Sequence, residues 1–287
     1  MMEDQEERDS GEPKDTEASV GSKTLELVER EEETLPEELP KWAGVDHSKL
    51  YIWVADAGND RIQKFDGNGK FLFQFGKKAG TRAPYREGEF KGPFGVAVDK
   101  EDNIWVADTG CHRIQKFDSE GDFILAVGSE GWGQEKFYWP EAIIAEPMGT
   151  ILVADTANHS LKRYDNDGDF LLGFGYPGDF DGFCKYPAGV ALDQEGNIYV
   201  ADRDNQRIQV FDSNGKFLSQ WTGTGGVSTL FMTKDQHIWT GGVLRNLKGE
   251  VVARLPGNPG GHGATVTESG DVFIAQLSGI VQKFVKQ

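Results

Sequence analysis

The sequence contains few of the residues that would place it among disulfide-stapled or membrane-spanning proteins. Its 287 residues include two cysteines, Cys111 and Cys184, which are predicted to be free thiols in a reducing compartment. No run approaches the ~20 consecutive apolar residues of a membrane helix. The N-terminal residues also lack the apolar core of a secretory signal. These absences predict a soluble, cytoplasmic protein without membrane contact.

Positive charge is also scarce. The formal net charge is −17, of which residues 1–40 carry −11 and the rest of the chain carries −6. Because nucleic-acid binding draws most of its affinity from Lys and Arg on phosphates, this balance argues against RNA as a partner. Residues 1–22 are polar, charged and nearly free of aliphatic side chains. They are predicted to form a disordered acidic tail, for which a solubilising role is favoured over a docking role.

A short hydrophobic motif is present in six copies. The copies begin at Ile52, Ile104, Ile151, Ile198, Ile238 and Val272, at spacings of 52, 47, 47, 40 and 34 residues. The first four copies end in Ala-Asp, whereas the last two are degenerate. A period of tens of residues indicates a repeat architecture, in which no single unit can bury its own hydrophobic face.

Each full unit holds four short apolar runs that are rich in Val, Ile, Phe, Tyr and Trp and show no useful helical period. In the second unit they span residues 95–99, 104–108, 113–117 and 123–127, and an Asp-x-x-Gly turn separates the last two. Four antiparallel strands repeated six times predict an all-β fold, a six-bladed β-propeller over residues 23–287.

The sixth unit, residues 262–285, holds only three of these runs. A matching run lies near the N-terminus, where residues 23–28 parallel 70–75, and residues 40–46 parallel the first strand of the second unit. An open ring would expose two unpaired strand edges. Residues near 23–29 are therefore predicted to pair with the strand around 280–285 and close the ring.

Residues 55–66, Ala-Asp-Ala-Gly-Asn-Asp-Arg-Ile-Gln-Lys-Phe-Asp, resemble the NHL repeat, as do residues 107–118 and 201–212. The C-terminal residues 272–285 resemble the end of bacterial NHL proteins related to peptidyl-hydroxyglycine amidating lyase. The resemblance covers roughly residues 41–287 and implies a six-bladed propeller. It does not imply one function, because fold and activity are separable.

The strand order places the connectors between blades on one face of the ring, called the loop face below. Three long connectors, residues 76–92, 128–139 and 175–186, belong to this face, and long loops in compact folds tend to carry function. The first strand of each blade should line the central channel. The residues at these strand starts are Lys41 or Trp42, Phe94, Glu141, Ala188, Ser228 and His262.

The resemblance to the amidating lyase implies three histidines at such strand starts, holding a catalytic zinc with one open position. Only His262 is a histidine here, and Glu141 is the one further oxygen ligand. Two donors are too few, so no metal and no cofactor are predicted. The sequence favours a non-catalytic binding module over a metal-dependent lyase or hydrolase with a degenerate site, and a purely structural interaction module is a third reading.

Aromatic residues on the connectors suit recognition of a peptide, a protein or a small ligand. Phe137, Trp139 and Tyr186 are predicted to pack between blades instead. A lone carboxylate at Glu141 needs a cation, from Lys41, from His262 or from the ligand, because an unpaired buried charge is costly. The predicted ligand-binding residues are Phe94, Glu141, Ser228, His262, Tyr85 and Trp132.

Some polar residues recur in several blades and are predicted to be structural. Because a residue needed in every blade holds the blade together, the Asp that ends the motif should accept hydrogen bonds from its own loop or from the Arg that follows. His112 and His159 occupy equivalent loop positions and are predicted to be loop residues. The recurring carboxylates are Asp56, Asp108, Asp155 and Asp202.

Overall fold

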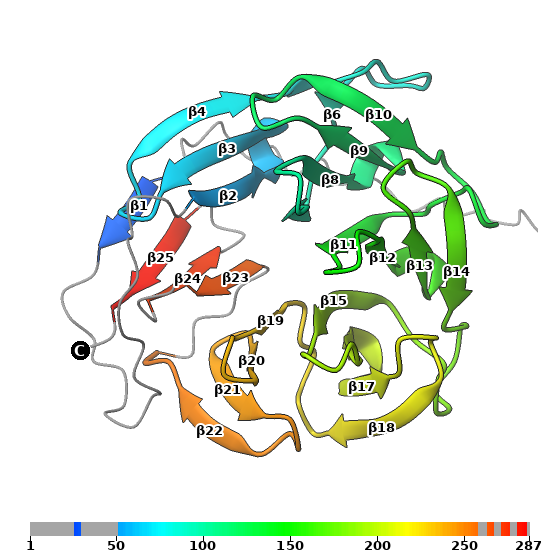
Figure 1. Ribbon diagram of the computed structural model, residues 1–287, viewed down its shortest axis with the longest axis vertical. Helices are drawn as coiled ribbons and strands as arrows, with labels where there is room; N and C mark the ends of the chain where they lie inside the picture. The colour runs from blue at the N-terminus through cyan, green and yellow to red at the C-terminus, as the bar shows by residue number, and fades with distance from the viewer. Residues whose placement is uncertain (1–25, 30–50, 258–262, 267–270, 276–279, 286–287) are drawn as a thin grey trace, which may run out of the picture.

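The computed structural model describes residues 26–29, 51–257, 263–266, 271–275 and 280–285. These residues form six radial sheets arranged as a ring, and the chain runs once around it (Figure 1). The prediction of an all-β, six-bladed propeller is confirmed. The helical elements among the described residues are four 3-10 turns, one after the second strand of each of blades 1 to 4. No described segment forms a helix long and apolar enough to cross a membrane.

The strands of each blade run in order from the axis of the ring to its rim (Figure 1). Blade 2 contains β7 (Val96–Val98), β8 (Ile104–Asp108), β9 (Arg113–Phe117) and β10 (Phe123–Val127). Blade 3 contains β11 (Pro140–Ala145), β12 (Ile151–Asp155), β13 (Ser160–Tyr164) and β14 (Phe170–Phe174). Blade 4 contains β15 (Pro187–Leu192), β16 (Ile198–Asp202), β17 (Arg207–Phe211) and β18 (Phe217–Thr222).

The remaining blades follow the same plan. Blade 5 contains β19 (Leu230–Met232), β20 (His237–Thr240), β21 (Val243–Asn246) and β22 (Val251–Arg254). Blade 1 contains β2 (Tyr51–Asp56), β3 (Arg61–Asp66) and β4 (Phe71–Phe75), and its predicted first strand at 40–46 lies outside the described residues. Blade 6 contains β23 (Gly263–Val266), β24 (Val272–Ala275) and β25 (Ile280–Phe284). A short pair, β5 (Lys77–Lys78) and β6 (Glu89–Phe90), lies within the first long connector.

Strand β1 (Glu26–Glu29) pairs with β25 and completes blade 6, as the sequence predicts. The register joins Glu26 to Ile280 and Glu29 to Lys283. This pairing is parallel, whereas the third and fourth strands of blades 1 to 5 pair antiparallel. An N-terminal strand therefore joins the two ends of the ring.

Deleting residues 1–30 is expected to lower the melting temperature, because it removes β1 and exposes the edge of β25. A loss of roughly 5–10 °C is expected, since each kcal/mol shifts the midpoint of a chain of this size by about 2–4 °C. Thermal unfolding followed by circular dichroism measures it. Deleting residues 1–22, which leaves β1 in place, is the control and should change little. Equal midpoints for the two deletions would contradict closure through β1.

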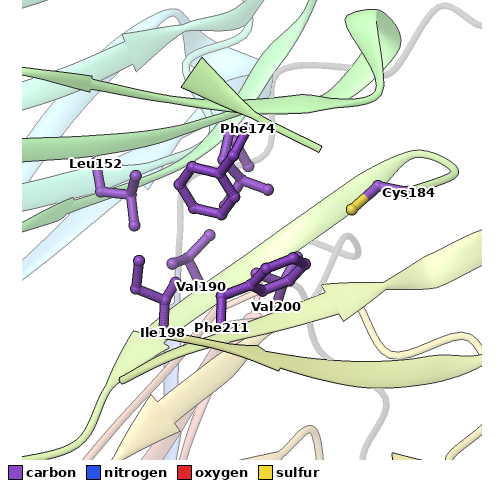
Figure 2. Packing of buried hydrophobic residues seen from close by; sticks show 9 residues of the cluster. Leu152, Phe174, Cys184, Val190, Ile198, Val200 and Phe211 are labelled. Atoms are coloured by element: carbon purple, nitrogen blue, oxygen red, sulfur yellow. The ribbon is translucent and has the colours of Figure 1, made fainter. Parts of the chain in front are cut away.

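The hydrophobic core lies between blades. The second strands β8, β12 and β16 are buried along their whole length, which explains why the repeated motif is a continuous apolar run. Figure 2 shows one interface, in which Leu152 and Phe174 of blade 3 face Val190, Ile198 and Phe211 of blade 4. Each blade therefore buries its face against the next blade.

The Asp-x-x-Gly turns form as predicted. In blade 3 the Asp165 carboxylate accepts hydrogen bonds from the amides of Asp167 and Asp169, at 3.0 and 2.8 Å. Gly168 adopts a φ of 91°, and a Cβ there would lie 2.6 Å from Cγ2 of Val127 in blade 2. Glycine is thus needed both for the left-handed backbone and for close packing on the neighbouring blade.

Candidate ligand-binding site at the loop face

The recurring Asp residues are structural, as predicted. Asp108 is fully buried and accepts hydrogen bonds from Nε of Arg113 at 2.9 Å and from Nε2 of Gln115 at 3.0 Å. In blade 4, Asp202 is equally buried and accepts from Nε of Arg207 at 2.7 Å and from Nε2 of Gln209 at 3.1 Å. Burial raises the pKa of Asp108, and hydrogen bonds together with the charge of Arg113 oppose part of that rise.

The Asp, Arg and Gln of a blade also bind the main chain of the connector that precedes it, and we call this trio the main-chain clamp. In blade 4, Asp202 accepts the amide of Lys185 at 2.6 Å, and Arg207 donates to the carbonyls of Phe180 and Phe183. Gln209 donates to the carbonyl of Phe183 at 2.7 Å and accepts the amide of Gly182 at 2.9 Å. Apart from Sγ of Cys184, which lies 3.6 Å from Nε2 of Gln209, these connector partners are backbone groups, so the clamp holds the connector mainly through its main chain.

The clamp of blade 2 repeats this pattern on the first long connector. Asp108 accepts the amide of Lys91 at 2.9 Å, and Arg113 donates to the carbonyls of Arg86 and Glu89 at 2.8 and 2.7 Å. Gln115 donates to the carbonyl of Glu89 at 2.9 Å and accepts the amide of Gly88 at 3.1 Å. The two connectors differ in length and sequence, yet the same backbone positions are held.

Blade 3 builds its clamp from different residues. Ser160 stands where blades 2 and 4 have Arg, and Lys162 stands where they have Gln. The Nζ of Lys162 lies 2.7 Å from Oδ2 of Asp155 and donates to the carbonyls of Gly133 and Lys136. One ammonium thus replaces both the charge of Arg and the main-chain contacts of Gln.

His112 and His159 join neighbouring blades at the loop face. Nδ1 of His112 accepts the amide hydrogen of Trp139 at 3.2 Å, and Nδ1 of His159 accepts that of Tyr186 at 3.0 Å. In blade 1 the carboxylate of Asp60 accepts the amide of Gly92 at 2.8 Å in the same way. The two histidine contacts fix the residue directly before the first strand of the next blade, and the Asp60 contact fixes a residue four positions before β7. The prediction that both histidines are loop residues agrees with this role.

Acid is expected to weaken these histidine contacts, because a protonated Nδ1 cannot accept a hydrogen bond. Burial lowers the pKa of both imidazoles. A group whose folded pKa is depressed contributes stability above its unfolded pKa of about 6.5 and loses it as the pH falls through the folded value. The melting temperature should therefore fall more steeply below about pH 6.5 in the wild type than in the His112→Asn/His159→Asn variant. Asn accepts the same bond without titrating and tolerates a left-handed backbone. Parallel pH profiles for the two proteins would refute this.

Glu141 and Arg203 form an ion pair where the first strands begin. Nη1 of Arg203 lies 3.1 Å from Oε2 of Glu141, and the guanidinium carbon lies 5.9 Å from the centre of the Tyr186 ring. Burial raises the pKa of the Glu141 carboxyl, and Arg203 opposes part of that rise. The cation that Glu141 needs is therefore supplied by Arg203, whereas Lys41 and His262 lie outside the described residues.

Arg203 breaks the pattern of its repeat position. The equivalent residues in blades 2 and 3 are Thr109 and Thr156, whose hydroxyls donate to the carbonyls of Pro140 and Pro187 in the next blade, both at 2.7 Å. Arg203 instead crosses to the strand start of blade 3. Blade 1 has Ala57 at this position, so short side chains stand there in blades 1 to 3 and the long cation in blade 4 is a departure from the repeat.

Two exposed aromatic residues neighbour Glu141 along the backbone, because Trp139 lies two residues before it and Phe94 adjoins Gly95, where a Cβ would lie 2.5 Å from the Glu141 carbonyl oxygen. Trp139 is 50% exposed and Phe94 is 36% exposed. The exposure of Trp139 contradicts the prediction that it packs between blades. The ring of Tyr138 stacks on His112, and Trp139 stacks on Tyr138. Phe137 is fully buried as predicted, and Tyr186 is half-buried against His159.

The other predicted site residues are spread over the loop face and its connectors. Ser228 is half-buried before β19, and Ala188 is buried. Tyr85 is half-buried over Arg113, to which its carbonyl is also bonded, and Trp132 is 69% exposed. His262 lies outside the described residues.

Comparison with known proteins identifies the repeat. The model of the NHL repeat matches residues 90–117 and 185–211, which span the first three strands of blades 2 and 4. The chain carries NHL repeats.

Curated relatives share only part of this NHL propeller. A probable peptidyl-alpha-hydroxyglycine alpha-amidating lyase of Caenorhabditis elegans is 29% identical over 118 residues, which are 38% of this chain and 33% of that protein. The peptidyl-glycine alpha-amidating monooxygenase A of Xenopus laevis is 34% identical over 34% of this chain and 11% of its own length. The NHL repeat-containing protein 2 of Bos taurus is 34% identical over 30% of this chain and 12% of its length. The matches thus span at most a third of these relatives.

Solved structures share the fold of the NHL propeller. A streptogramin B lyase matches with a TM-score of 0.58 at 19% identity, covering 80% of this chain and 74% of that one. A catalytically inactive virginiamycin B lyase from Staphylococcus aureus with quinupristin matches with a TM-score of 0.59 at 13% identity, covering 83% of this chain and 77% of that one. At such identities the likeness concerns the fold alone.

A catalytic zinc would need metal donors at the strand starts of this NHL propeller. Four strand starts are described, at Phe94, Glu141, Ala188 and Ser228, and Glu141 is the one strong metal donor among them. Its carboxylate is already paired with Arg203. Within the described part of the chain, no group of three or more His, Cys, Asp or Glu side chains could hold a metal ion. The described residues therefore do not fit a three-ligand zinc centre.

Proposed function

We propose that the chain is a non-catalytic binding module that takes a peptide, protein or small ligand on the loop face of blades 2 to 4. One observation carries this proposal. The Glu141–Arg203 pair departs from the repeat, and the exposed residues Trp139 and Phe94 neighbour Glu141 along the backbone. An arrangement that occurs once among repeated blades is better explained by recognition of a ligand than by the packing of the blades.

The residues around the pair offer complementary chemistry. The side chains of Glu141 and Arg203 are 16% and 26% exposed. Each can therefore form a hydrogen bond with a polar group of a ligand as well as with the other. Trp139 and Phe94 supply apolar surface beside them, and Ser228 adds a hydroxyl further around the ring. Trp132 and Tyr85 extend the surface along the connectors. We propose His262 as a further member of this site.

Two accessory proposals follow from the rest of the chain. Cys111 and Cys184 are both buried and unpaired, which supports a reducing compartment such as the cytoplasm as the place of action. Residues 1–22 are proposed as a separate acidic tail, and residues 23–287 as the propeller domain.

Selection of random peptides against the immobilised full chain tests the binding role. Peptides that bind should lose at least about ten-fold in affinity with Glu141→Ala or Trp139→Ala, as expected when a central contact worth ~1.4 kcal/mol or more is removed. Glu120→Ala, in an exposed turn on the opposite face, should bind as the wild type does. Binders that respond only to changes on the opposite face would refute this placement.

A metal-dependent lyase or hydrolase is the second candidate, favoured by the similarity to proteins named as amidating lyases. In that case Glu141 and His262 would be the donors supplied by the strand starts. Metal analysis of the purified full chain separates the two candidates. Stoichiometric zinc that is lost in His262→Ala would favour the enzyme, whereas substoichiometric metal in both proteins would favour the binding module.

A further inference from the structure

The connectors before blades 3 and 4 share one main-chain arrangement. They are equal in length and span residues 128–139 and 175–186. The clamp of blade 4 binds the carbonyls of Phe180 and Phe183. The clamp of blade 3 binds those of Gly133 and Lys136, at the matching positions of its connector. The side chains of the two connectors can therefore be compared position by position.

Three aromatic rings distinguish the connector before blade 4, at Tyr176, Phe180 and Phe183. The matching residues before blade 3 are Ser129, Gly133 and Lys136. Because the connector of blade 3 keeps the same main-chain contacts without an aromatic ring at any of these positions, the fold of the connector does not require the rings.

The three rings form an exposed cluster, which we call the aromatic tip. Tyr176 is 64% exposed, Phe180 is 74% exposed and Phe183 is 37% exposed. The ring centre of Phe183 lies 6.0 Å from that of Tyr176 and 6.1 Å from that of Phe180. Rings that contact one another while they remain in water leave apolar surface that a partner could bury.

Carboxylates flank the aromatic tip. Asp179 and Asp181 stand on either side of Phe180 in the chain, and all three residues are exposed. Arg207, the cation that binds this main chain, is buried and paired with Asp202 at 2.7 Å, so it does not neutralise them. The surface thus combines aromatic faces with negative charge, and both attract a cation.

Arginine fits this combination better than lysine does. Its guanidinium is planar, stacks on aromatic faces and donates paired hydrogen bonds to a carboxylate, whereas the ammonium of lysine is a strongly hydrated point charge. The molecule already contains a contact of this kind at the loop face. There the guanidinium of Arg203 lies 5.9 Å from the centre of the Tyr186 ring and pairs with Glu141.

We propose that the aromatic tip binds an arginine side chain of a partner protein, with the guanidinium against the rings and paired with Asp179 or Asp181. The proposal rests on the proposed function, because this connector belongs to the loop face, and it gives the ligand a stated chemistry. The clamp holds the main chain of the tip in place, so little further ordering is needed on binding.

Titration of the full chain with a labelled peptide of alternating arginine and serine, followed by fluorescence polarisation, tests this assignment. Phe180→Ala should weaken binding at least about ten-fold. Because this change leaves every charge of the chain in place, the loss cannot come from the acidic residues 1–22. Citrulline in place of arginine, which keeps the shape of the side chain without its charge, should weaken binding as much, and lysine should also weaken it.

Matched controls separate the aromatic tip from other exposed surface. Ile124→Ala removes a side chain that is 45% exposed on the outer strand of blade 2, and it should bind as the wild type does. Gln134→Ala changes the exposed residue before blade 3 that matches Asp181, and it should also have no effect. If Phe180→Ala fails to fold, Tyr176→Ala tests the same surface with a second ring.

The outcomes are distinct. Losses with Phe180→Ala and with citrulline, but not with either control, support the proposal. Arginine peptides that bind Phe180→Ala or the citrulline form equally well overturn it, and so does equal binding of the lysine peptide. Randomly selected peptides that depend on Glu141 but not on Phe180 would overturn it and leave the proposed function standing.

Two other occupants of the aromatic tip would also overturn the proposal. A dimer of the free chain that Phe180→Ala dissociates would assign this surface to a second copy. Phosphatidylcholine vesicles that bind the wild type but not Phe180→Ala, with no binding of the arginine peptide, would assign it to a lipid headgroup. Size-exclusion chromatography and vesicle sedimentation measure these two outcomes.

Discussion

Lys162→Gln is expected to lower the free energy of unfolding by about 3–5 kcal/mol, the usual effect of removing one partner of a buried ion pair. Asp155 is fully buried, and Nζ of Lys162 is its nearest cation at 2.7 Å. Glutamine could restore a hydrogen bond but not the charge, because blade 3 has Ser160 where its neighbours have Arg. Urea unfolding of the purified variant measures the loss.

A second substitution should rescue this variant. Ser160→Arg/Lys162→Gln recreates the trio of blades 2 and 4, so it should recover most of the lost stability. Lys216→Gln, on an exposed turn, is the control and should change stability by less than about 0.5 kcal/mol. Failure of the double variant to recover stability would show that the clamps of blades 3 and 4 are not interchangeable.

Val153→Asp is expected to abolish soluble folding. Val153 lies at the centre of β12 with no exposed surface, and it packs in the interface between blades 2 and 3. An unpaired carboxylate there costs several kcal/mol, a large fraction of the stability of a typical domain. Expression followed by size-exclusion chromatography shows the result.

Val252→Asp is the matched control for this experiment, because Val252 is 46% exposed on the outer strand of blade 5. It should remain soluble and cooperatively folded. A soluble, cooperatively unfolding Val153→Asp protein would show that the second strands are not the core of the blades.

The ring could be predicted from the sequence because its signals are local and repeated. The run from Ile104 to Asp108 is buried on both faces, so it reads as a continuous apolar motif. The turn from Asp165 to Gly168 follows a fixed chemistry, and both features recur from blade to blade. The unmatched run near residue 26 then predicted the pairing of β1 with β25. The parallel direction of that pairing has no counterpart in the repeat and could not be read from it.

The candidate site was less predictable because it depends on irregular segments. The counter-ion of Glu141 is 62 residues away in the chain, and no periodicity connects Glu141 with Arg203. Aligning the repeats would have singled out Arg203, since the equivalent residues are Ala57, Thr109 and Thr156. Trp139 was misplaced because Tyr138 takes the contact with His112 that Tyr186 makes with His159 in blade 4, and the repeat does not show which of two adjacent aromatic residues makes that contact.

The main-chain clamp has a consequence for how new binding surfaces could arise on this ring. Since a connector is held mainly by hydrogen bonds to its amides and carbonyls, its exposed side chains can be replaced without destabilising the propeller. Trp132, Asp179 and Phe180 stand at such tips. Random libraries at these three positions should therefore yield stable variants at high frequency. The binding specificity of each connector could then be changed separately while the propeller stays folded.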